Sequence, residues 1–382
     1  MLKIGIACYP TLGGSGVVAT ELGKIMAEKG HEIHFITDRI PFRLGKFHKN
    51  IYYHEVEVSD YYVFHYAPYD LALANKLAQV AKQENLDLLH VHYAVPHAIC
   101  AYLAKQMVGD HLKVVTTLHG TDITILGHDP SLRDLIRLAI HQSDAVTAVS
   151  KDLMLETTEV LDIEKPIDLV YNFIDHREYF SPGHSRLRSQ YAAPNEKILL
   201  HMSNFRQVKR VCDVVDIFAK VNRQVPSRLV FVGEGPELAK TVSLLKELGL
   251  SDRVHYLGKQ ENVAEVMKMA DLLLLPSEKE SFGLVALEAM AGGVPTIGSH
   301  AGGIPEVVSH AETGFLSPVG HTDDMADYAI TLLTDPKLYS QFSLAGMQRS
   351  RTLFSAAVIA EQYEKIYCRV VQKRLWETVI SS

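Results

Sequence analysis

The sequence predicts an α/β protein with two doubly wound parallel sheets, one in each of two domains. Short apolar runs of strand length alternate with helical patterns along almost the whole chain, which is typical of parallel sheets covered by helices on both faces. The chain of 382 residues is also long enough for two hydrophobic cores. Such sheets bind ligands at the carboxyl ends of their strands, and we expect the two edges to face each other across a cleft between the domains.

Each expected strand is a short apolar run, and each expected helix has apolar residues at helical spacing. The strands expected in the first half are 3–8, 32–37, 52–58, 86–91, 113–118, 145–149 and 167–170, and the helical patterns include 17–28, 71–83 and 132–141. In the second half we expect strands at 197–202, 228–232, 254–257, 272–275, 296–298 and 314–316, and helices at 210–222, 236–248, 263–269 and 324–334.

Turn-forming residues divide the chain near its middle. Ser181-Pro182-Gly183-His184 and Ala193-Pro194-Asn195 are typical of turns and linkers. We therefore expect an N-terminal domain over 1–175 and a C-terminal domain over 176–354. A long helical pattern closes the sequence, and we expect this segment, 355–382, to pack back on the first domain.

Composition narrows the class of protein. The hydrophobic fraction of 47% is ordinary for a soluble globular protein, and the net charge of −7 argues against broad nucleic-acid binding. No apolar run approaches the roughly 20 residues of a membrane span, and the first residues enter a strand pattern without a basic leader. The four cysteines are far apart, so we expect a reduced cytoplasmic protein. Homo-oligomerisation stays open.

The most specific pattern is a pair of glutamates that follows the buried strand 272–275. Glu280 precedes an expected helix at 285–291, and Glu288 lies inside that helix. The unpaired N–H groups and positive dipole of a helix N-terminus suit a phosphate. A diphosphate there leaves Glu288 to accept hydrogen bonds from ribose hydroxyls, and Glu280 to accept them from a sugar. The spacing therefore predicts a nucleotide-sugar site.

Positive groups follow the first strand of the second half. Arg206, Lys209 and Arg210 lie just past that strand, where they could neutralise a diphosphate. Cations are unfavourable at a helix N-terminus, so local stability does not require them there. The glycine loops 233–236 and 302–303 follow other strands of this half, and their location suggests further contacts with a nucleotide.

Two loops of the first half also indicate ligand binding. Gly13-Gly14-Ser15-Gly16 joins the first strand to the first helix, and its glycines allow a close approach of backbone to ligand. Ala19 at the third position of a dinucleotide fingerprint and Asp38 as a ribose-binding acid keep an NAD site open. His119 ends the strand 113–118, where a ring nitrogen or the carbonyl can meet a polar ligand.

The sequence does not indicate a metal site. We expect His90 and His92 to point to opposite faces of their strand, with no third ligand nearby. There is also no Asp-x-Asp pair that could hold a divalent ion with a diphosphate.

Together these residues resemble the retaining glycosyltransferases of family 4, which share the GT-B fold of two facing Rossmann-like domains. The matching pieces are 13–16, 119–122, 172–175, 232–236, 280–288 and 302–306. The two-glutamate element is the specific part of this match. Within the family, the segments 10–16, 90–97 and 203–206 are similar to the branch that transfers N-acetylglucosamine to L-malate in bacillithiol biosynthesis.

The resemblance implies a retaining hexosyl transfer from UDP-N-acetylglucosamine to the hydroxyl of L-malate, without a cofactor or a metal. Four residues are expected to act at the reacting groups: His119 beside the donor sugar, Glu280 on a sugar hydroxyl, and Lys209 with Arg206 on the charge of the leaving UDP. The family also implies a same-face displacement in which the leaving phosphate oxygen takes the acceptor proton, so little general-base help is needed.

Further residues are expected to bind the substrates. The donor-binding set is Gly14, Asn204, Phe282, Gly283, Leu284 and Glu288, and the acceptor-binding set is Ser15, Tyr93 and Thr121. The chain departs from the family pattern at Asn204, where an arginine is usual, so either Asn204 or Arg206 takes that role. Transfer from another nucleotide sugar to an acceptor such as an inositol phosphate, an NAD-dependent oxidoreductase, and a sugar-nucleotide sensor without catalysis stay as alternatives.

Overall fold

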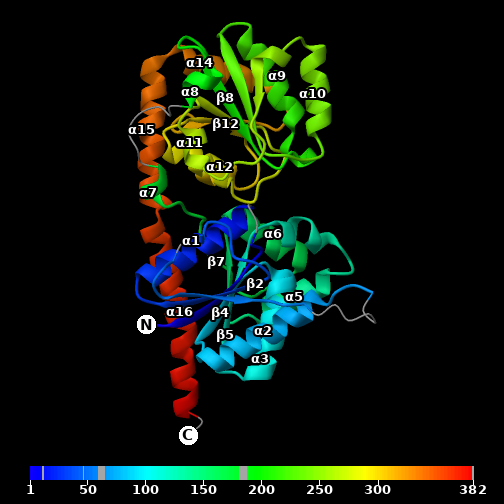
Figure 1. The fold of residues 1–382 in the computed structure, drawn as a ribbon, viewed down its shortest axis with the longest axis vertical. Coiled ribbons are helices and arrows are strands. Elements are labelled where there is room, and N and C mark those ends of the chain that lie inside the picture. Colours follow the sequence, from blue (N-terminus) through cyan, green and yellow to red (C-terminus); the bar gives the residue numbers. More distant parts are fainter. Residues whose placement is uncertain (11–12, 46, 59–64, 180–186, 381–382) are drawn as a thin grey trace. The chain divides into compact units, whose positions relative to one another are not determined.

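Figure 1 shows the computed structural model, which describes residues 1–10, 13–45, 47–58, 65–179 and 187–380. The chain divides into two compact units. The first consists of Met1–Asn172 together with Ala356–Ser382, and the second of Phe173–Ser355. Of the two turn segments expected to join the domains, 193–195 belongs to the second unit and 181–184 lies outside the described residues.

In its described residues, the first unit contains a seven-stranded parallel sheet with the order β3-β2-β1-β4-β5-β6-β7. The strands are β1 (Lys3–Ala7), β2 (Glu32–Thr37), β3 (Ile51–Glu55), β4 (Leu88–His92), β5 (Lys113–Leu118), β6 (Ala145–Ala148) and β7 (Asp168–Leu169). The helices are α1 (Gly14–Glu28), α2 (Tyr69–Glu84), α3 (Ile99–Val108), α4 (Thr121–Thr124), α5 (Arg133–Gln142), α6 (Lys151–Leu161) and α16 (Ala356–Ile380). The strand order reverses between β1 and β4, which is where such sheets form a ligand-binding crevice.

The second unit, as far as it is described, has a six-stranded parallel sheet with the order β10-β9-β8-β11-β12-β13. The strands are β8 (Lys197–Met202), β9 (Ser227–Val232), β10 (Val254–Tyr256), β11 (Leu272–Leu275), β12 (Thr296–Ser299) and β13 (Gly314–Ser317). The helices are α7 (His176–Tyr179), α8 (Arg188–Tyr191), α9 (Val211–Asn222), α10 (Leu238–Glu247), α11 (Val263–Met267), α12 (Leu284–Ala291), α13 (Ile304–Val307), α14 (Thr322–Thr334) and α15 (Pro336–Leu353). Apolar side chains of α9 and α14 form one core with those of β8, β9, β11 and β12.

The terminal helix α16 completes the core of the first unit. It packs against α1 and β5, and its Tyr363 and Tyr367 are fully buried. The Tyr367 hydroxyl lies 2.7 Å from His90 Nδ1, and the Tyr363 hydroxyl lies 3.2 Å from Thr117 Oγ1. Polar groups buried in this way need partners, and here both tyrosines find them on the central strands.

The predicted fold class is confirmed, and most predicted strands agree with the structure within two residues. β4 begins at Leu88 rather than at 86 because the Leu86 N–H still donates to the Ala81 carbonyl at the end of α2, at 3.0 Å. The strand predicted at 52–58 is wrong at its end, since β3 stops at Glu55. The predicted elements also did not include α15. None of the described helices combines the length and apolar character that a membrane crossing requires.

The expectation for His90 and His92 is wrong. Their ring centroids are 4.5 Å apart, so both rings lie on the same face of β4. Successive side chains on a strand alternate between faces, and residues two positions apart therefore share one.

Candidate functional site

The carboxyl ends of the neighbouring strands β8 and β11 bring Lys209 and Glu280 together. The Lys209 ammonium lies 2.5 Å from Glu280 Oε1, and Ser277 donates its hydroxyl to the same oxygen at 3.1 Å. The two loops also join through their backbones, because the Glu278 N–H donates to the Val208 carbonyl at 2.8 Å. Two residues predicted to act on the donor, 71 positions apart in the sequence, thus form one largely buried ion pair.

Two glycines let a second loop pack directly on the backbone of Glu280. The Gly303 N–H donates to the Glu280 carbonyl at 2.8 Å. Gly302 has a φ of 54°, and a Cβ atom there would lie 2.1 Å from the same carbonyl oxygen. Only glycine fits this left-handed position and this close approach. The 302–303 loop therefore fixes the backbone that carries Glu280.

Helix α12 begins beside this loop, and its N-cap residue is a glycine, which has no side chain to cap the helix. Its N-cap is Gly283, with a φ of 91°, and the first turn, which starts at Leu284, carries no acidic residue. The Phe282 ring is buried and packs edge-on against Phe354, with the ring centroids 5.8 Å apart. Phe282 can therefore offer a ligand only its backbone groups. A helix start of this kind suits a phosphate group.

Glu288 lies on α12 and is largely buried. It accepts a hydrogen bond from the Tyr179 hydroxyl at 2.8 Å, and Tyr179 is itself buried. The sequence analysis did not identify Tyr179, since the residue lies on the four-residue helix α7 outside any recognisable motif. Tyr179 holds one carboxylate oxygen of the residue that is predicted to bind a ribose.

The three cations that follow β8 differ in their surroundings. Lys209 contacts Glu280, whereas Arg210, the N-cap residue of α9, pairs with Asp213 in the first turn of that helix, with Nε 2.6 Å from Oδ2. Arg206 is exposed, and among the described residues it has no ion-pair partner. Asn204 is also exposed, and its backbone is tightly packed because a Cβ atom at Gly235 would lie 2.0 Å from the Asn204 carbonyl oxygen. Of the three cations, only Arg210 is therefore paired with α9, and Arg206 and Lys209 are not.

In the first unit, the ends of β4 and β5 bring His92, Tyr93 and His119 together. His92 Nδ1 lies 2.8 Å from His119 Nε2, and the rings of Tyr93 and His119 have centroids 5.2 Å apart. The Tyr93 N–H donates to the Thr117 carbonyl at 2.9 Å, which extends the strand pairing to the edge. Tyr93 has a φ of 84°, an unusual conformation for a residue with a side chain.

Asp122 fixes the loop after β5. Its carboxylate accepts the Gly120 N–H at 2.9 Å and the Ala94 N–H at 3.0 Å, so it ties the His119 loop to the Tyr93 loop. Burial raises the pKa of Asp122 to about 6, although the backbone donors oppose this shift. Asp122 belongs to the segment 119–122 that resembles the family, but the spacing of residues in that segment could not show that Asp122 accepts from the Ala94 N–H.

Burial also determines the charge of the histidines at this edge. It lowers the pKa of His119 to about 3, with a further contribution from His97, and it lowers the pKa of His92 well below the ordinary value. His119 is therefore neutral at physiological pH. It can donate or accept a hydrogen bond there, but it does not supply a positive charge.

The remaining predicted residues of the first unit lie on the loops of the same edge. Gly14 and Ser15 form the first turn of α1, directly after β1; Gly14 is exposed and Ser15 partly buried. Thr121 is exposed at the start of α4. Asp38, the acid considered for an NAD ribose, accepts from Arg39 with Nη2 3.1 Å from Oδ2. Because β1, β4 and β5 are adjacent and parallel, these loops leave the sheet on the same side.

One group of possible metal ligands converges in the described part of the chain, namely Glu32, His34 and Glu84. The Lys3 ammonium lies 2.9 Å from Glu32 Oε1, and His34 Nε2 lies 3.0 Å from the same oxygen. A lysine thus already supplies positive charge to this group. Glu32 and His34 belong to the amino-terminal part of β2, whereas the predicted substrate residues follow the carboxyl ends of strands.

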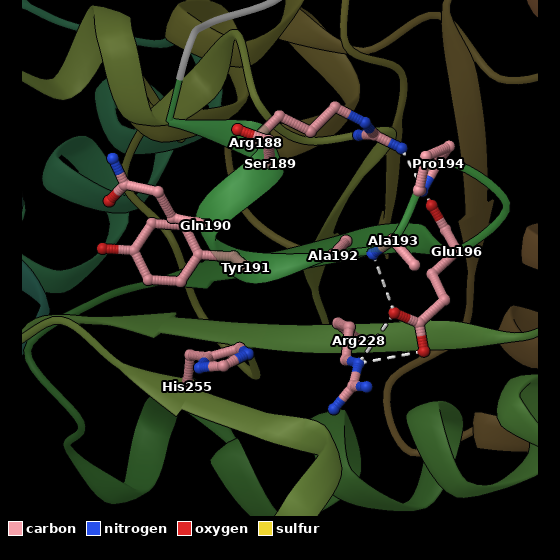
Figure 2. A pocket seen from close by; sticks show the side chains of 10 residues that line it. All are labelled: Arg188, Ser189, Gln190, Tyr191, Ala192, Ala193, Pro194, Glu196, Arg228 and His255. Atoms are coloured by element: carbon pink, nitrogen blue, oxygen red, sulfur yellow. Dashed lines mark hydrogen bonds and ion pairs between the residues drawn. The ribbon is translucent and has the colours of Figure 1, made fainter.

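A hollow of about 630 Å³ opens at the amino ends of β8 and β9 in the second unit (Figure 2). Figure 2 shows Glu196 and Arg228 turned toward each other, with Arg228 Nε 3.0 Å from both carboxylate oxygens. Arg188, another lining residue, pairs with Asp271 at 2.8 Å. The main charges of this hollow are therefore already paired, and none of the residues predicted to bind substrate lines it.

Comparison with known proteins gives matches over both units. Residues 12–178 match the family model described as Glycosyltransferase Family 4, and residues 185–349 match that of Glycosyl transferases group 1. The N-acetyl-alpha-D-glucosaminyl L-malate synthase of Bacillus anthracis is 59% identical over 372 residues, which cover 97% of this chain and 98% of that protein. A D-inositol 3-phosphate glycosyltransferase of Mycobacteroides abscessus is 28% identical over 258 residues, or 64% of this chain and 56% of that protein.

A solved structure shares the architecture. The crystal structure of Anabaena HepE in complex with UDP and glucose superposes with a TM-score of 0.80 at 21% sequence identity, over 96% of this chain and 99% of that chain. A likeness at this level of identity concerns the fold, and it agrees with the predicted GT-B architecture of two Rossmann-like domains.

Proposed function

This chain belongs to glycosyltransferase family 4, and we propose that it transfers N-acetylglucosamine from UDP-N-acetylglucosamine to the hydroxyl group of L-malate. The observation that carries the proposal is the 59% identity to the synthase of B. anthracis, because the alignment spans nearly the full length of both chains. The name of that protein gives its product as an α-N-acetylglucosaminyl L-malate. We propose the same product here, formed in the cytoplasm as the first step of bacillithiol biosynthesis.

In this proposal, the second unit holds the donor. Glu288 accepts hydrogen bonds from the ribose hydroxyls, and Glu280 accepts one from the sugar. The start of α12, with the amides of Phe282, Gly283 and Leu284, receives the diphosphate. The 2.5 Å contact between Lys209 and Glu280 supports this arrangement, since it keeps an ammonium beside the carboxylate that is to meet the sugar.

The reaction retains the α configuration at the anomeric carbon. The bond from C1 to the UDP oxygen breaks, and the malate hydroxyl oxygen bonds to C1 from the same face. Its proton passes to the leaving phosphate oxygen. Lys209 and Arg206 stabilise the negative charge that grows on UDP, and this electrostatic term is commonly a large part of catalysis. The scheme requires no divalent metal.

The first unit binds the acceptor and assists the donor sugar. A dicarboxylate such as L-malate needs hydrogen-bond donors, which the hydroxyls of Ser15, Tyr93 and Thr121 supply. Gly14 admits the diphosphate close to the backbone. His119 is neutral because burial lowers its pKa to about 3, so it assists by hydrogen bonding.

The alternatives have weaker support. Transfer to an inositol phosphate is supported only by relatives such as one that is 28% identical and aligned over 56% of its own length. The oxidoreductase reading relied on Asp38 as a ribose acid, and Asp38 is paired with Arg39. Neither is favoured over L-malate.

A direct assay tests the proposal. The full chain is incubated with UDP-N-acetylglucosamine and a panel of acceptors that includes L-malate, D-malate and inositol 3-phosphate, with and without EDTA. We expect UDP release with L-malate alone, product mass equal to that of the conjugate, an α anomeric signal by NMR, and no loss of rate with EDTA. Product with inositol phosphate and none with L-malate would overturn the acceptor, and a β signal would overturn retention.

A further inference from the structure

His92 and His119 share one hydrogen bond between two ring nitrogens. His92 Nδ1 lies 2.8 Å from His119 Nε2, and the rings are stacked with centroids 5.1 Å apart. A bond of this kind needs one nitrogen that carries a proton and one that does not. The fold therefore couples the tautomer of His119 to that of His92.

Both rings are neutral, so each carries one proton. Burial is the main reason, because it lowers the pKa of His92 well below the ordinary value and that of His119 to about 3. Two arrangements remain. Either His92 donates from Nδ1 and His119 carries its own proton on Nδ1, or His119 donates from Nε2 and His92 carries its proton on Nε2.

The surroundings of His92 distinguish the two arrangements. His92 is fully buried, and its Nε2 has no hydrogen-bond partner among the described residues. If His119 were the donor, the proton of His92 would lie on this Nε2 as a buried N–H without an acceptor. Such orphaned N–H groups are rarer in proteins than under-used acceptors. The first arrangement leaves only a lone pair there.

We propose that His92 is a positioning residue that donates its Nδ1 hydrogen to His119 Nε2 and thereby holds His119 as the tautomer protonated on Nδ1. The role rests on the proposed function, in which His119 meets the donor sugar. The ring nitrogen of His119 left for a substrate is then a hydrogen-bond donor. It selects an oxygen acceptor, such as a hydroxyl or carbonyl oxygen of the sugar, and it cannot act as a general base.

The neighbouring ring of His90 keeps the His92 ring in place. The ring centroids of His90 and His92 are 4.5 Å apart. Hydrogen bonds fix the His90 ring at both nitrogens: Nδ1 lies 2.7 Å from the Tyr367 hydroxyl, and Nε2 lies 2.7 Å from Thr117 Oγ1. The Tyr367 hydroxyl keeps its hydrogen because burial raises its pKa well above the ordinary value. A stack of rings anchored from α16 to the end of β5 thus restricts the orientation of His119.

Nitrogen NMR reads the tautomer directly. The full chain is labelled with ¹⁵N-histidine, and the His119 signals are identified by their loss in His119→Asn. We expect the two-bond correlation pattern of a ring protonated on Nδ1, unchanged between pH 6 and pH 8. A pattern with the proton on Nε2 would overturn the proposal. Because this measurement does not use the reaction, it stands whether or not L-malate is the acceptor.

Two variants of matched shape test the consequence. Asparagine at 92 keeps an amide N–H near the place of Nδ1, whereas leucine removes it. We expect His92→Leu to shift His119 toward the Nε2 tautomer and to lower kcat about tenfold to hundredfold, with KM for the donor within about threefold of wild type. His92→Asn should restore the tautomer and most of kcat.

Other outcomes separate the proposal from its premise. Equal loss of kcat in His92→Asn and His92→Leu, with both variants folded by circular dichroism, would reduce His92 to a packing role and overturn it. An unchanged His119 tautomer in His92→Leu would do the same. A wild-type protein with the expected tautomer and no transferase product would instead reject the proposed function and leave the hydrogen-bond assignment intact.

Discussion

The Tyr179 hydroxyl donates to Glu288 Oε1 at 2.8 Å, and both side chains are buried in the second unit. A buried carboxylate is costly unless hydrogen bonds satisfy it. Tyr179 therefore satisfies one oxygen of Glu288 and orients the carboxylate that we propose binds the ribose. The contact also means that a change at Tyr179 should be detected in nucleotide binding.

Replacement of Glu288 by glutamine tests the ribose contact. The amide keeps the shape of the side chain but loses the charge, and hydrogen bonds to charged groups are stronger than neutral ones. We expect the Kd of UDP, measured by calorimetry, to rise about tenfold to hundredfold. The 2′-deoxy and 3′-deoxy analogues of UDP should bind the wild type less tightly than UDP, and the variant, whose neutral amide forms weaker hydrogen bonds, should discriminate against them less.

Two controls accompany this prediction. Tyr179→Phe removes only the orienting hydroxyl and should raise the Kd less than Glu288→Gln does. Glu312→Gln removes a charge from an exposed residue of the same unit and should leave the Kd unchanged. Discrimination against the deoxy analogues that is as strong in Glu288→Gln as in the wild type would reject the assignment of Glu288 to the ribose.

Replacement of Lys209 by methionine tests the stabilisation of the leaving UDP. We expect kcat to fall about a hundredfold, because the negative charge of the departing diphosphate loses an adjacent ammonium. Lys220→Met is the control, since Lys220 pairs with Asp216 on α9 and has no predicted role. Steady-state UDP release measures both. Near-normal kcat in Lys209→Met would contradict the role.

The same assay decides between Asn204 and Arg206. Both are exposed, so neither substitution should destabilise the fold much. Arg206→Met should lower kcat/KM for the donor more than Asn204→Ala, since only the arginine can pair with a phosphate oxygen. The reverse order would assign the contact to Asn204.

Substitution of Gly302 by alanine tests how strictly the glycine loop holds Glu280. Gly249 provides a matched control, because it also has a positive φ, 66°, but its Cβ would meet nothing within 4 Å. Gly249→Ala should lower the free energy of unfolding by about 1 kcal/mol, the cost of the left-handed conformation alone. Gly302→Ala adds the clash with the Glu280 carbonyl and should cost about 2–4 kcal/mol in total. Urea denaturation measures both, and equal values would show that the loop yields without strain.

The sequence allowed the local features of the site to be predicted. Leu272–Leu275 is a continuous apolar run and forms the predicted strand, and the loops after it and after β8 carry Glu280 and Lys209. These strands are neighbours in the sheet, so loops that leave their carboxyl ends meet. The convergence of Lys209 and Glu280 follows from this general property of parallel sheets.

Contacts that depend on tertiary packing could not be predicted. Tyr179 reaches Glu288 across 109 positions of sequence, and Asp122 reaches the Ala94 N–H across 28. Neither partner is fixed by a local period. The wrong prediction for His90 and His92 had a different cause. Residues two positions apart on a strand share a face, and the prediction placed them on opposite faces. With the correct period, the sequence alone places both rings on one face of β4. It does not predict that the Tyr367 hydroxyl bonds His90.

The last prediction concerns acid stability and follows from His90. Burial, with a contribution from His119, lowers the pKa of His90 from 6.5 to about 3 in the folded protein. The unfolded chain therefore binds a proton below about pH 6.5 that the folded chain does not take up until about pH 3. The free energy of unfolding must fall as the pH drops through this window, by up to about 1.4 kcal/mol per pH unit from this residue.

His90→Gln removes this titration, and its amide can still bond Tyr367 and Thr117. We expect its free energy of unfolding, measured in urea between pH 4.5 and 7.5, to depend on pH with a slope smaller by about one proton than that of the wild type. Asp122 acts in the opposite direction, because its raised pKa, about 6, makes the folded state bind the extra proton below that pH. Because Asp122 contributes equally to both proteins, the quantity to compare is the slope of the wild type minus that of His90→Gln. Identical slopes in wild type and His90→Gln would show that His90 takes up its proton equally in the folded and the unfolded protein.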